Sequence, residues 1–477
     1  MEMWEKDPLE DFIQTFLVRL SPSKELPESI QSFQVFRDDE LNIVMQVNSH
    51  ADSRPTIEEK PLGLVYQLDN QIELKGYVGS GTLHRVALFN TTSKILNDNQ
   101  DSATISKYKV SELNFTISTS ETSYTIDHIA NLPGNYTWPN ASNSKESGTQ
   151  EICFLGEPPI TITRPLPSID SINRNCVRIE IGGHTVILAS VKEKNHSSAK
   201  RPGYIFYSGN PDKTTREKIR ASLSFALGMP LVYLSSCFYK ETGGLIGFEA
   251  SSPATMGGRA WRLVSQPFAP ITSYPTNILD TNAFKQIATA FFENYDSMNL
   301  QSFIFRLWHA EISPSYMKAA YYGAMVESIQ KRETHKPNST ISHTIIEKAE
   351  YRKAIKILSR FLEKQKIPKE AKESLLNKIQ NGNTAPQRTL ADRFYSTMGL
   401  ALGSLETAAW DRRNDAAHGN EEVPGTEIES FRSTKILRVI LARIVIKLLQ
   451  ASEYYIDYYS LDHPIRLLSQ AIPNDTD

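Results

Sequence analysis

The feature that most constrains this chain is a change in its hydrophobic pattern near residue 280. Before that point, short runs of alternating apolar and polar residues lie between turn residues, a pattern typical of β-strands. After it, apolar residues recur at the spacing of amphipathic helices. The sequence therefore predicts an α+β protein, with a β-rich region over 1–280 and an all-α bundle over 281–477. The β-rich region is expected to be a sandwich or barrel-like sheet with one or two helices, either undivided or split into 1–150 and 151–280.

Local signals in the β-rich region predict three of its parts. Alternating residues on both sides of Gly182-Gly183 indicate a hairpin over Val177–Val191, because two glycines suit a tight primed turn. A helix is expected over Lys213–Leu227, ended by Gly228 and Pro230. The stretch 131–176 is rich in Pro, Asn and Ser, and it predicts long loops.

The second region carries several amphipathic segments, separated by prolines. Helical spacing is found over Ala283–Asn294, Ser315–Lys331, Thr344–Lys366, Thr389–Ala416 and Ser430–Tyr459. The last is the longest and has a wide apolar face, which would serve either core packing or dimerisation. Arg438, Arg443 and Lys447 interrupt it, so it is not expected to span a membrane.

Composition excludes several classes of protein. Of the 477 residues, 40% are apolar and 22% are charged, which is enough apolar material for globular cores and argues against disorder. The formal net charge of −2 argues against a protein that coats nucleic acid along its whole length. Locally, Lys331–Arg393 holds 15 Lys and Arg against 7 Asp and Glu. This excess is typical of a solvated helical surface or of a face that attracts phosphates.

Cysteine usage and the first residues bear on the compartment. Cys153, Cys176 and Cys237 are odd in number and form no C-x-x-C pair, so neither a disulfide framework nor a zinc site is expected. The start, MEMWEKDPLEDF, has no basic segment followed by an apolar run, as a signal peptide would. We therefore expect a cytoplasmic protein without a membrane partner.

Common cofactor and metal motifs are missing from the sequence. It contains no G-x-x-x-x-G-K-[ST] phosphate loop, no H-E-x-x-H zinc motif and no G-x-S-x-G nucleophile turn. We accordingly expect no cofactor and no metal.

One constellation remains, in the segment WDRRNDAAHGN at 410–420. Arg413 and Asn414 are followed by His418 and then by Gly419. On a continuous helix Arg413 and His418 would lie about 1.4 turns apart, so they converge only if His418 lies past the helix end, as Gly419 allows.

These residue types suit the cleavage of RNA by its own 2′-hydroxyl. That reaction needs a group to move protons and a cation to stabilise charge on the phosphorane oxygens. Histidine titrates near cellular pH, and the arginine fork matches phosphate geometry. Asn414 would hold the imidazole or the phosphate by hydrogen bonding.

A purely structural interpretation competes with this one. Arg413 would pair with Asp411 or Asp415 on its own helix, and His418 would simply lie at the helix C-terminus, where a cationic histidine is favoured.

The RN-x-x-x-HG string, after several helical segments and before a long final helix, resembles the R-x4–6-H motif of the HEPN superfamily. Tyr321–Ile329 (YYGAMVESI) looks like the first helix of such a bundle. The layout of a large β-rich region before the bundle is similar to that of the ApeA-like HEPN proteins of bacterial anti-phage defence. This likeness is one of motif and architecture, and it does not extend to any motif within residues 1–280.

The resemblance implies a metal-independent endoribonuclease with Arg413, Asn414 and His418 as catalytic residues. It also implies a homodimer with one composite site and a cellular RNA, such as tRNA, as the substrate. Residues 1–280 would then sense a trigger, for which a phage component is one candidate, and restrain the nuclease. The alternatives are a non-catalytic HEPN module for dimerisation or RNA binding, and a partner subunit of another effector such as a nucleotidyltransferase or a short Argonaute.

Overall fold

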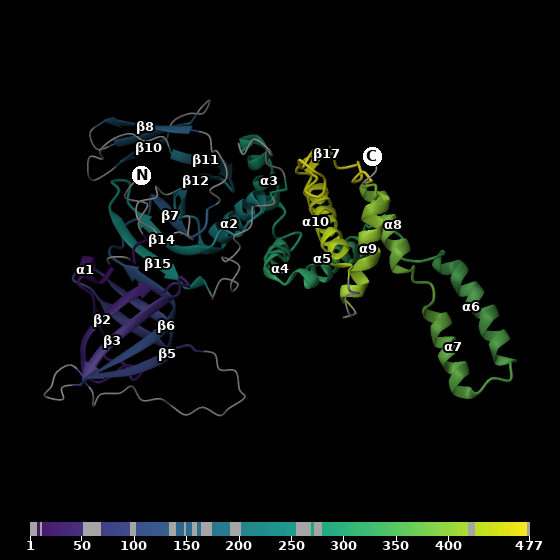
Figure 1. Cartoon of the computed structure of the whole chain (residues 1–477), viewed down its shortest axis with the longest axis horizontal. Helices are drawn as coiled ribbons and strands as arrows, with labels where there is room; N and C mark the ends of the chain where they lie inside the picture. Colours follow the sequence, from purple (N-terminus) through teal and green to yellow (C-terminus); the bar gives the residue numbers. More distant parts are fainter. Residues whose placement is uncertain are drawn as a thin grey trace. The chain divides into compact units, whose positions relative to one another are not determined.

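The computed structural model describes residues 7–9, 12–50, 68–95, 102–132, 140–146, 149–154, 160–163, 174–190, 202–253, 269–270, 279–417 and 425–474. The chain forms two compact units, Met1–Ile312 and Ser313–Asp477 (Figure 1). The expected boundary at 280/281 coincides with the start of the helices, but the first two of these helices, over 281–312, belong to the first unit.

The first unit contains the elements α1 Phe12–Phe16, β1 Arg19–Leu20, β2 Ile30–Arg37, β3 Ile43–His50, β4 Gln71–Lys75, β5 Ser80–Ile95, β6 Ser102–Thr116, β7 Tyr124–Ile129, β8 Asn140–Glu146, β9 Thr149–Phe154, β10 Ile160–Thr163, β11 Arg174–Ile181, β12 His184–Ser190, β13 Gly203–Ser208, α2 Lys213–Leu227, β14 Tyr233–Tyr239, β15 Leu245–Ser251, α3 Thr281–Glu293 and α4 Leu300–Ile312. The second unit contains α5 Ser315–His335, α6 Lys348–Glu363, α7 Lys369–Asn381, α8 Gln387–Met398, α9 Ser404–Ala417, α10 Glu427–Leu449, β16 Tyr454–Ile456 and β17 Ile465–Leu467. The protein is thus α+β, as the sequence predicts.

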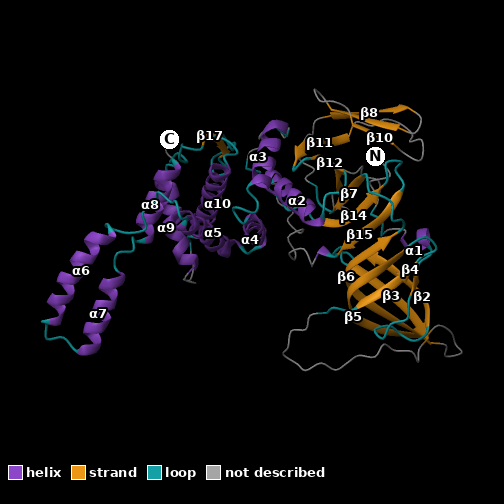
Figure 2. Cartoon of the chain, turned by 180° about the vertical axis from the view of Figure 1, so that it is seen from behind, coloured by secondary structure: helices purple, strands orange, loops and turns teal. Residues whose placement is uncertain are grey.

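One antiparallel sheet dominates the first unit (Figure 2). Its 15 strands within the described residues follow the order β1-β4-β5-β6-β15-β14-β7-β13-β12-β11-β8-β9-β10, with β2 and β3 branching from β6. Strand β6 makes the branch because it pairs with β3 along its first half and with β15 along its second, while β5 covers its other edge. The core of this region includes Phe12 of α1, which contacts Phe115 and Phe248 edge-on at ring-centroid distances of 5.1 and 5.2 Å.

The predicted hairpin and helix are both confirmed. Strands β11 and β12 pair in a register that places Ile181 opposite His184, and both turn glycines have positive φ, at 60° and 79°. Helix α2 covers Lys213–Leu227, with Asp212 capping its first turn and Gly228 in the left-handed conformation after its last.

The prediction of long loops over 131–176 is wrong in part. That stretch includes β8, β9 and β10, which pair in sequence order, and the start of β11. Strand β8 reads NASNSKE, so it has no apolar alternation from which a strand could be predicted. Backbone hydrogen bonds to neighbouring strands form a ladder without that pattern.

Charged residues join α2 to the sheet. The fully buried Asp127 of β7 pairs with Arg220 and lies 3.5 Å from Nε of Arg216. It also accepts hydrogen bonds from Tyr207 at 3.0 Å and Ser236 at 2.6 Å. Burial raises the pKa of Tyr207 well above its usual value, and Asp127 raises it further. Such a paired and hydrogen-bonded set satisfies charges that would otherwise be costly to bury.

In the second unit, α10 packs against α5 and α9, and α5 packs against α8 and α9. The fully buried side chains at the centre include Tyr322, Val326, Phe394, Leu437 and Ile444. Two of the helical expectations need correction. The run Thr389–Ala416 is two helices, because Gly399 adopts a left-handed conformation between α8 and α9. The run Ser430–Tyr459 stops as a helix at Leu449, and its end forms strand β16, which pairs with β17.

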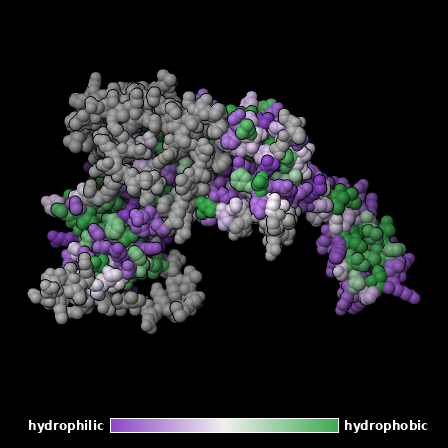
Figure 3. Space-filling view, in the orientation of Figure 1, coloured by the Kyte–Doolittle hydropathy of each residue, from purple (hydrophilic) through white to green (hydrophobic). Residues whose placement is uncertain are grey.

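Helices α6 and α7 form a hairpin that contacts the bundle at its base. There Asn383 bonds to the backbone of Ile345 and Ile346, and Arg393 of α8 donates to the carbonyls of Ser342 and Thr344. Neither helix contains a buried residue. Apolar side chains lie exposed along the hairpin (Figure 3), namely Ile345, Ile346, Ile357, Leu358, Phe361 and Leu375.

Among the described helices, none has both the length and the apolar character needed to cross a membrane.

Candidate functional site

The segment that carries the R-x4-H motif lies at the end of α9. Arg413 is 6% exposed and lies in the last turns of the helix. Asn414 belongs to the same helix, but its side chain is outside the described residues, as is all of His418. The structure therefore places the arginine of the motif, and it leaves the convergence of Arg413 with His418 as a prediction.

The guanidinium of Arg413 is held on two sides. Its Nη2 and Nε donate to Oε1 of Glu327 on α5, at 2.7 and 3.2 Å. Its Nη1 donates to the carbonyl oxygen of Trp410, one turn earlier on α9. The guanidinium carbon also lies 3.5 Å from the centre of the Trp410 ring, in a stacked cation–π arrangement. The side chain is thus fixed in direction before any substrate is bound.

The pairing with Glu327 differs from the structural interpretation, which placed an acid of α9 beside Arg413. Asp411 is exposed on α9, and the side chain of Asp415 lies outside the described residues. Glu327 comes from a different helix, 86 positions earlier in the chain. Its side chain is 30% exposed, so this ion pair reaches the surface at the carboxylate and not at the arginine.

Gly323 makes the approach of the two helices possible. A Cβ atom at this position would lie 2.8 Å from Cδ of Arg413 and 3.3 Å from its Cβ and Cγ. Since Gly323 precedes Glu327 by four residues, both lie on the same face of α5. Gly323 leaves space for the aliphatic part of the Arg413 side chain, and Glu327 binds its guanidinium.

Sequence reasoning did not single out Gly323 or Glu327, although both lie in the segment YYGAMVESI. A usable signal was present, because a glycine and an acid lie four residues apart within a mostly apolar segment. A charged residue on such a face indicates a partner, but the sequence does not say which cation fills that role.

A second ion pair lies beside the first, on the surface. Arg412 binds Glu429 in the first turn of α10 at 2.5 Å, and the two side chains are 48% and 52% exposed. An exposed pair of this kind contributes about 0–1 kcal/mol. It nevertheless joins the helix that carries the motif to the helix that follows it.

The other end of α9 is held by a buried ion pair. Glu406 and Arg443 of α10 are 0% and 1% exposed and bind each other. Arg443 also donates to the carbonyls of Ala401 and Leu468, at 3.0 and 2.7 Å. Burial raises the pKa of Glu406 above its usual value, and Arg443 offsets part of that increase. Helix α9 is therefore fixed to α10 and to the C-terminal segment before it reaches Arg413.

Trp410 contacts Arg413 and also lines a pocket. It contributes to a pocket of about 380 Å³ between α8 and α9, together with Arg388, Asp392 and Tyr395. Burial raises the pKa of Tyr395 far above its usual value, so the phenol stays neutral and can donate a hydrogen bond. The ring that contacts Arg413 therefore also borders a small pocket with both polar and apolar lining residues.

The guanidinium has a clear chemical capacity in this arrangement. Arginine carries five N–H donors, and the contacts with described residues use three of them. One N–H remains on each η nitrogen, and such charged donors can bind phosphate oxygens. Glu327 balances the positive charge at rest, so an incoming phosphate would compete with a carboxylate that is itself partly solvated.

Within the described part of the chain, no group of three or more His, Cys, Asp or Glu side chains is arranged to hold a metal ion. Cys176 and Cys237 are buried free thiols.

Comparisons with family models, with curated proteins and with solved structures gave no match to this chain.

Proposed function

We propose that this protein is a metal-independent endoribonuclease of the HEPN type, with Arg413, Asn414 and His418 at its active site. The observation that best supports the proposal is the fixed position of Arg413, whose guanidinium is oriented by Glu327 and Trp410 directly before the segment that carries His418. A cation whose direction is already fixed loses little conformational freedom when it binds a phosphate.

In the proposed reaction the 2′-oxygen of a ribose attacks the adjacent phosphorus and the bond to the 5′-oxygen breaks. The products are a 2′,3′-cyclic phosphate and a 5′-hydroxyl. His418 of one chain removes the 2′ proton, and a second His418 protonates the leaving oxygen, so two chains supply the acid and the base. Arg413 donates to the non-bridging oxygens, and Asn414 orients the imidazole or the phosphate.

The wider role follows from the resemblance in motif and layout. Residues 1–280 would restrain the nuclease until a trigger, such as a phage component, binds. The cleavage of a cellular RNA such as tRNA in the cytoplasm would then stop growth of the infected cell, as in abortive infection.

The test is RNA cleavage in EDTA by the wild type and by Arg413→Ala and His418→Ala. We expect a loss of at least about a hundredfold in each variant, since each removes a transition-state interaction. Arg412→Ala is the matched control, because Arg412 is the neighbouring arginine and forms only an exposed ion pair, so activity should be retained. Equal cleavage by all the proteins, or cleavage that requires Mg²⁺, would contradict the proposal.

One observation favours a second candidate, a non-catalytic bundle for dimerisation or RNA binding. Arg413 is buried and already paired, as a structural arginine would be. In that case His418→Ala would retain the defence phenotype or toxicity of the wild type in cells. Association with a stoichiometric effector subunit would instead indicate a partner role.

A further inference from the structure

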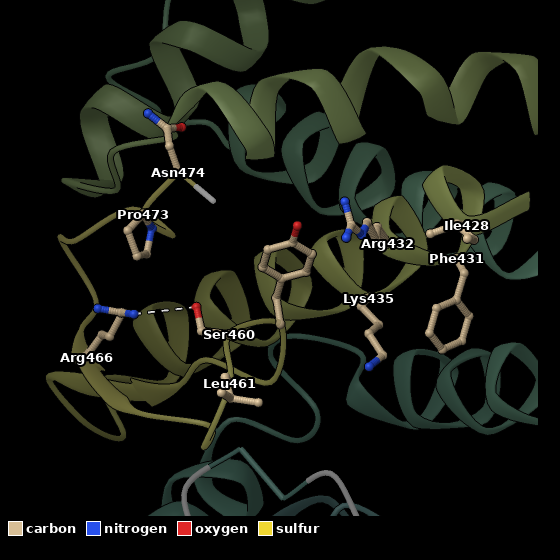
Figure 4. A pocket seen from close by; sticks show the side chains of 10 residues that line it. Ile428, Phe431, Arg432, Lys435, Ser460, Leu461, Arg466, Pro473 and Asn474 are labelled. Carbon is tan, nitrogen blue, oxygen red and sulfur yellow. Dashed lines mark hydrogen bonds between the residues drawn. The ribbon is translucent and has the colours of Figure 1, made fainter. Parts of the chain in front are cut away.

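A groove of about 830 Å³ lies on the second unit, along the first half of α10 (Figure 4). Its walls come from α10 on one side and from the segment after α10 on the other. The lining residues are Ile428, Phe431, Arg432, Lys435, Tyr459, Ser460, Leu461, Arg466, Pro473 and Asn474.

The charged side chains described at this groove are all cationic. Arg432, Lys435 and Arg466 line it, and among the described residues no aspartate or glutamate does. Figure 4 shows Arg432 and Lys435 on the α10 side and Arg466 on the opposite side. Cations on both walls of a concave surface raise the local concentration of anions.

Aromatic and apolar side chains lie between the cations. Phe431 is 55% exposed, and Nζ of Lys435 lies 4.9 Å from the centre of its ring. Tyr459 belongs to the lining as well. An exposed ring next to cations is the combination with which proteins bind single-stranded nucleic acid, because bases stack on rings and phosphates bind the cations.

The wall opposite α10 is preformed. The fully buried carboxylate of Asp457 accepts a hydrogen bond from Nε of Arg466 at 2.8 Å and from the hydroxyl of Ser460 at 2.6 Å. It also accepts the backbone amides of Tyr459 and Ser460, at 3.0 and 3.1 Å. Arg466 and Ser460 are therefore fixed at the groove before a ligand arrives, which lowers the entropy cost of binding.

The groove is also linked to the helix that carries the motif. Ile428, at one end of the lining, precedes Glu429, which binds Arg412 of α9. Ten positions separate His418 from Ile428 in the sequence.

We propose that this groove binds single-stranded RNA on one side of the bond that is cut, with a base on Phe431 and phosphates on Arg432, Lys435 and Arg466. This inference rests on the proposed function for the identity of the polymer. It adds a binding surface that the R-x4-H motif does not contain. An acidic peptide is the competing ligand, and it would use the cations but not the ring.

Binding is measured in EDTA by fluorescence anisotropy, with the full chain and a labelled 2′-O-methyl oligouridylate. This probe has no free 2′-hydroxyl, so it cannot be cleaved by the proposed reaction. Phe431→Ala should weaken binding about tenfold. Lys435→Gln should reduce the slope of log K against log salt concentration by about 0.7, the share of one phosphate on a single strand.

Matched controls come from outside the groove. Phe361 of α6 is 60% exposed, so Phe361→Ala should bind like the wild type. Lys24→Gln, at an exposed lysine of the first unit, should leave the salt slope unchanged.

Unchanged binding in Phe431→Ala and Lys435→Gln would overturn the groove proposal. Competition by a polyglutamate peptide, with affinity that is insensitive to Phe431→Ala, would overturn it in favour of an acidic partner. The two proposals fail separately. Loss of probe binding in the groove variants, in a protein that cleaves no RNA, would support the groove and reject the nuclease. If the protein cleaves RNA and its groove variants bind the probe normally, the nuclease proposal would be supported and the groove proposal rejected.

Discussion

Glu327, on a different helix from the R-x4-H motif, gives Arg413 a counter-charge. Arg413 is buried, so removal of Glu327 would take away the carboxylate that the described residues place beside its charge. We expect Glu327→Ala to lower the free energy of unfolding by about 1–3 kcal/mol. Chemical denaturation measures this. Glu429→Ala is the control, because it removes an exposed pair and should cost less than about 1 kcal/mol. Equal losses would show that burial of Arg413 does not set the energy of its pair.

His463, between β16 and β17, should make stability depend on pH. Burial lowers its pKa below the usual 6.5 and Lys435 lowers it further, while Asp457 and Asp462 oppose the shift. Between the folded and unfolded pKa values the unfolded chain binds more protons, so the free energy of unfolding increases with pH up to about 6.5. His463→Gln removes this titration, so the variant should gain stability relative to the wild type at pH 5 and not at pH 7.5.

Thermal unfolding at the two pH values measures the difference between the variant and the wild type. His335→Gln, at an exposed histidine of α5, is the control for a general effect of losing an imidazole. A difference between His463→Gln and the wild type that is the same at both pH values would contradict the prediction.

At the residue scale, the sequence singles out Arg413 as a candidate site residue but does not show which residues hold it. The motif lies within a few positions of one helix, and local spacing is what sequence patterns record. Glu327 and Gly323 contact Arg413 through the packing of α5 against α9, which depends on the whole bundle. The prediction that His418 approaches Arg413 remains open, because that residue lies outside the described part of the chain.

Among the elements, the α6–α7 hairpin is the most distinctive, because its apolar side chains contribute little to a folded core. Ile357 is 69% exposed and Ile444 of α10 is 0% exposed, so the same substitution should have different effects at the two positions. We expect Ile357→Ala to change the free energy of unfolding by less than about 0.5 kcal/mol. Ile444→Ala should lower it by about 2–5 kcal/mol through the cavity it leaves. Urea denaturation compares them, and a large loss at Ile357 would mean that the hairpin face is covered.

The elements that the sequence predicted well have strong local signals. Helix α2 has a cap at each end, and the β11–β12 hairpin has two glycines that adopt positive φ. The errors occur where tertiary contacts override the local pattern. The residues after Leu449 are rich in tyrosine and continue the apolar face of α10, but Gln450 adopts a left-handed conformation and the chain turns into β16. A single non-glycine residue at positive φ leaves no mark in a hydrophobicity pattern.

At the scale of the whole molecule, the second unit has a core of its own, and we expect residues 313–477 to fold when expressed alone. Circular dichroism should show a helical spectrum and one cooperative thermal transition. Arg443→Met, which leaves Glu406 buried without its partner, should destabilise the fragment and the full chain by a similar amount, about 3–5 kcal/mol. A fragment that melts without cooperativity would show that the second unit depends on the first.

The net charge differs in sign between the two predicted regions. Residues 281–477 carry 26 Lys and Arg against 23 Asp and Glu, so the net charge of −2 combines +3 in the helical region with −5 in the β-rich region. This modest partition was accessible from sequence. The groove could not be predicted from the sequence. Two of its cations lie on α10, but the third, Arg466, lies on β17, and the sequence did not predict that strand.

Helix α5 begins at Ser315, directly after the division between the two units, and it carries both Gly323 and Glu327 on one face. A rotation of this helix about its own axis would move the carboxylate and the empty space together, so Arg413 would lose its counter-charge and its clearance in a single motion. The first helix of the second unit therefore couples the charge environment of Arg413 to the space around its side chain, because one rigid element carries both residues.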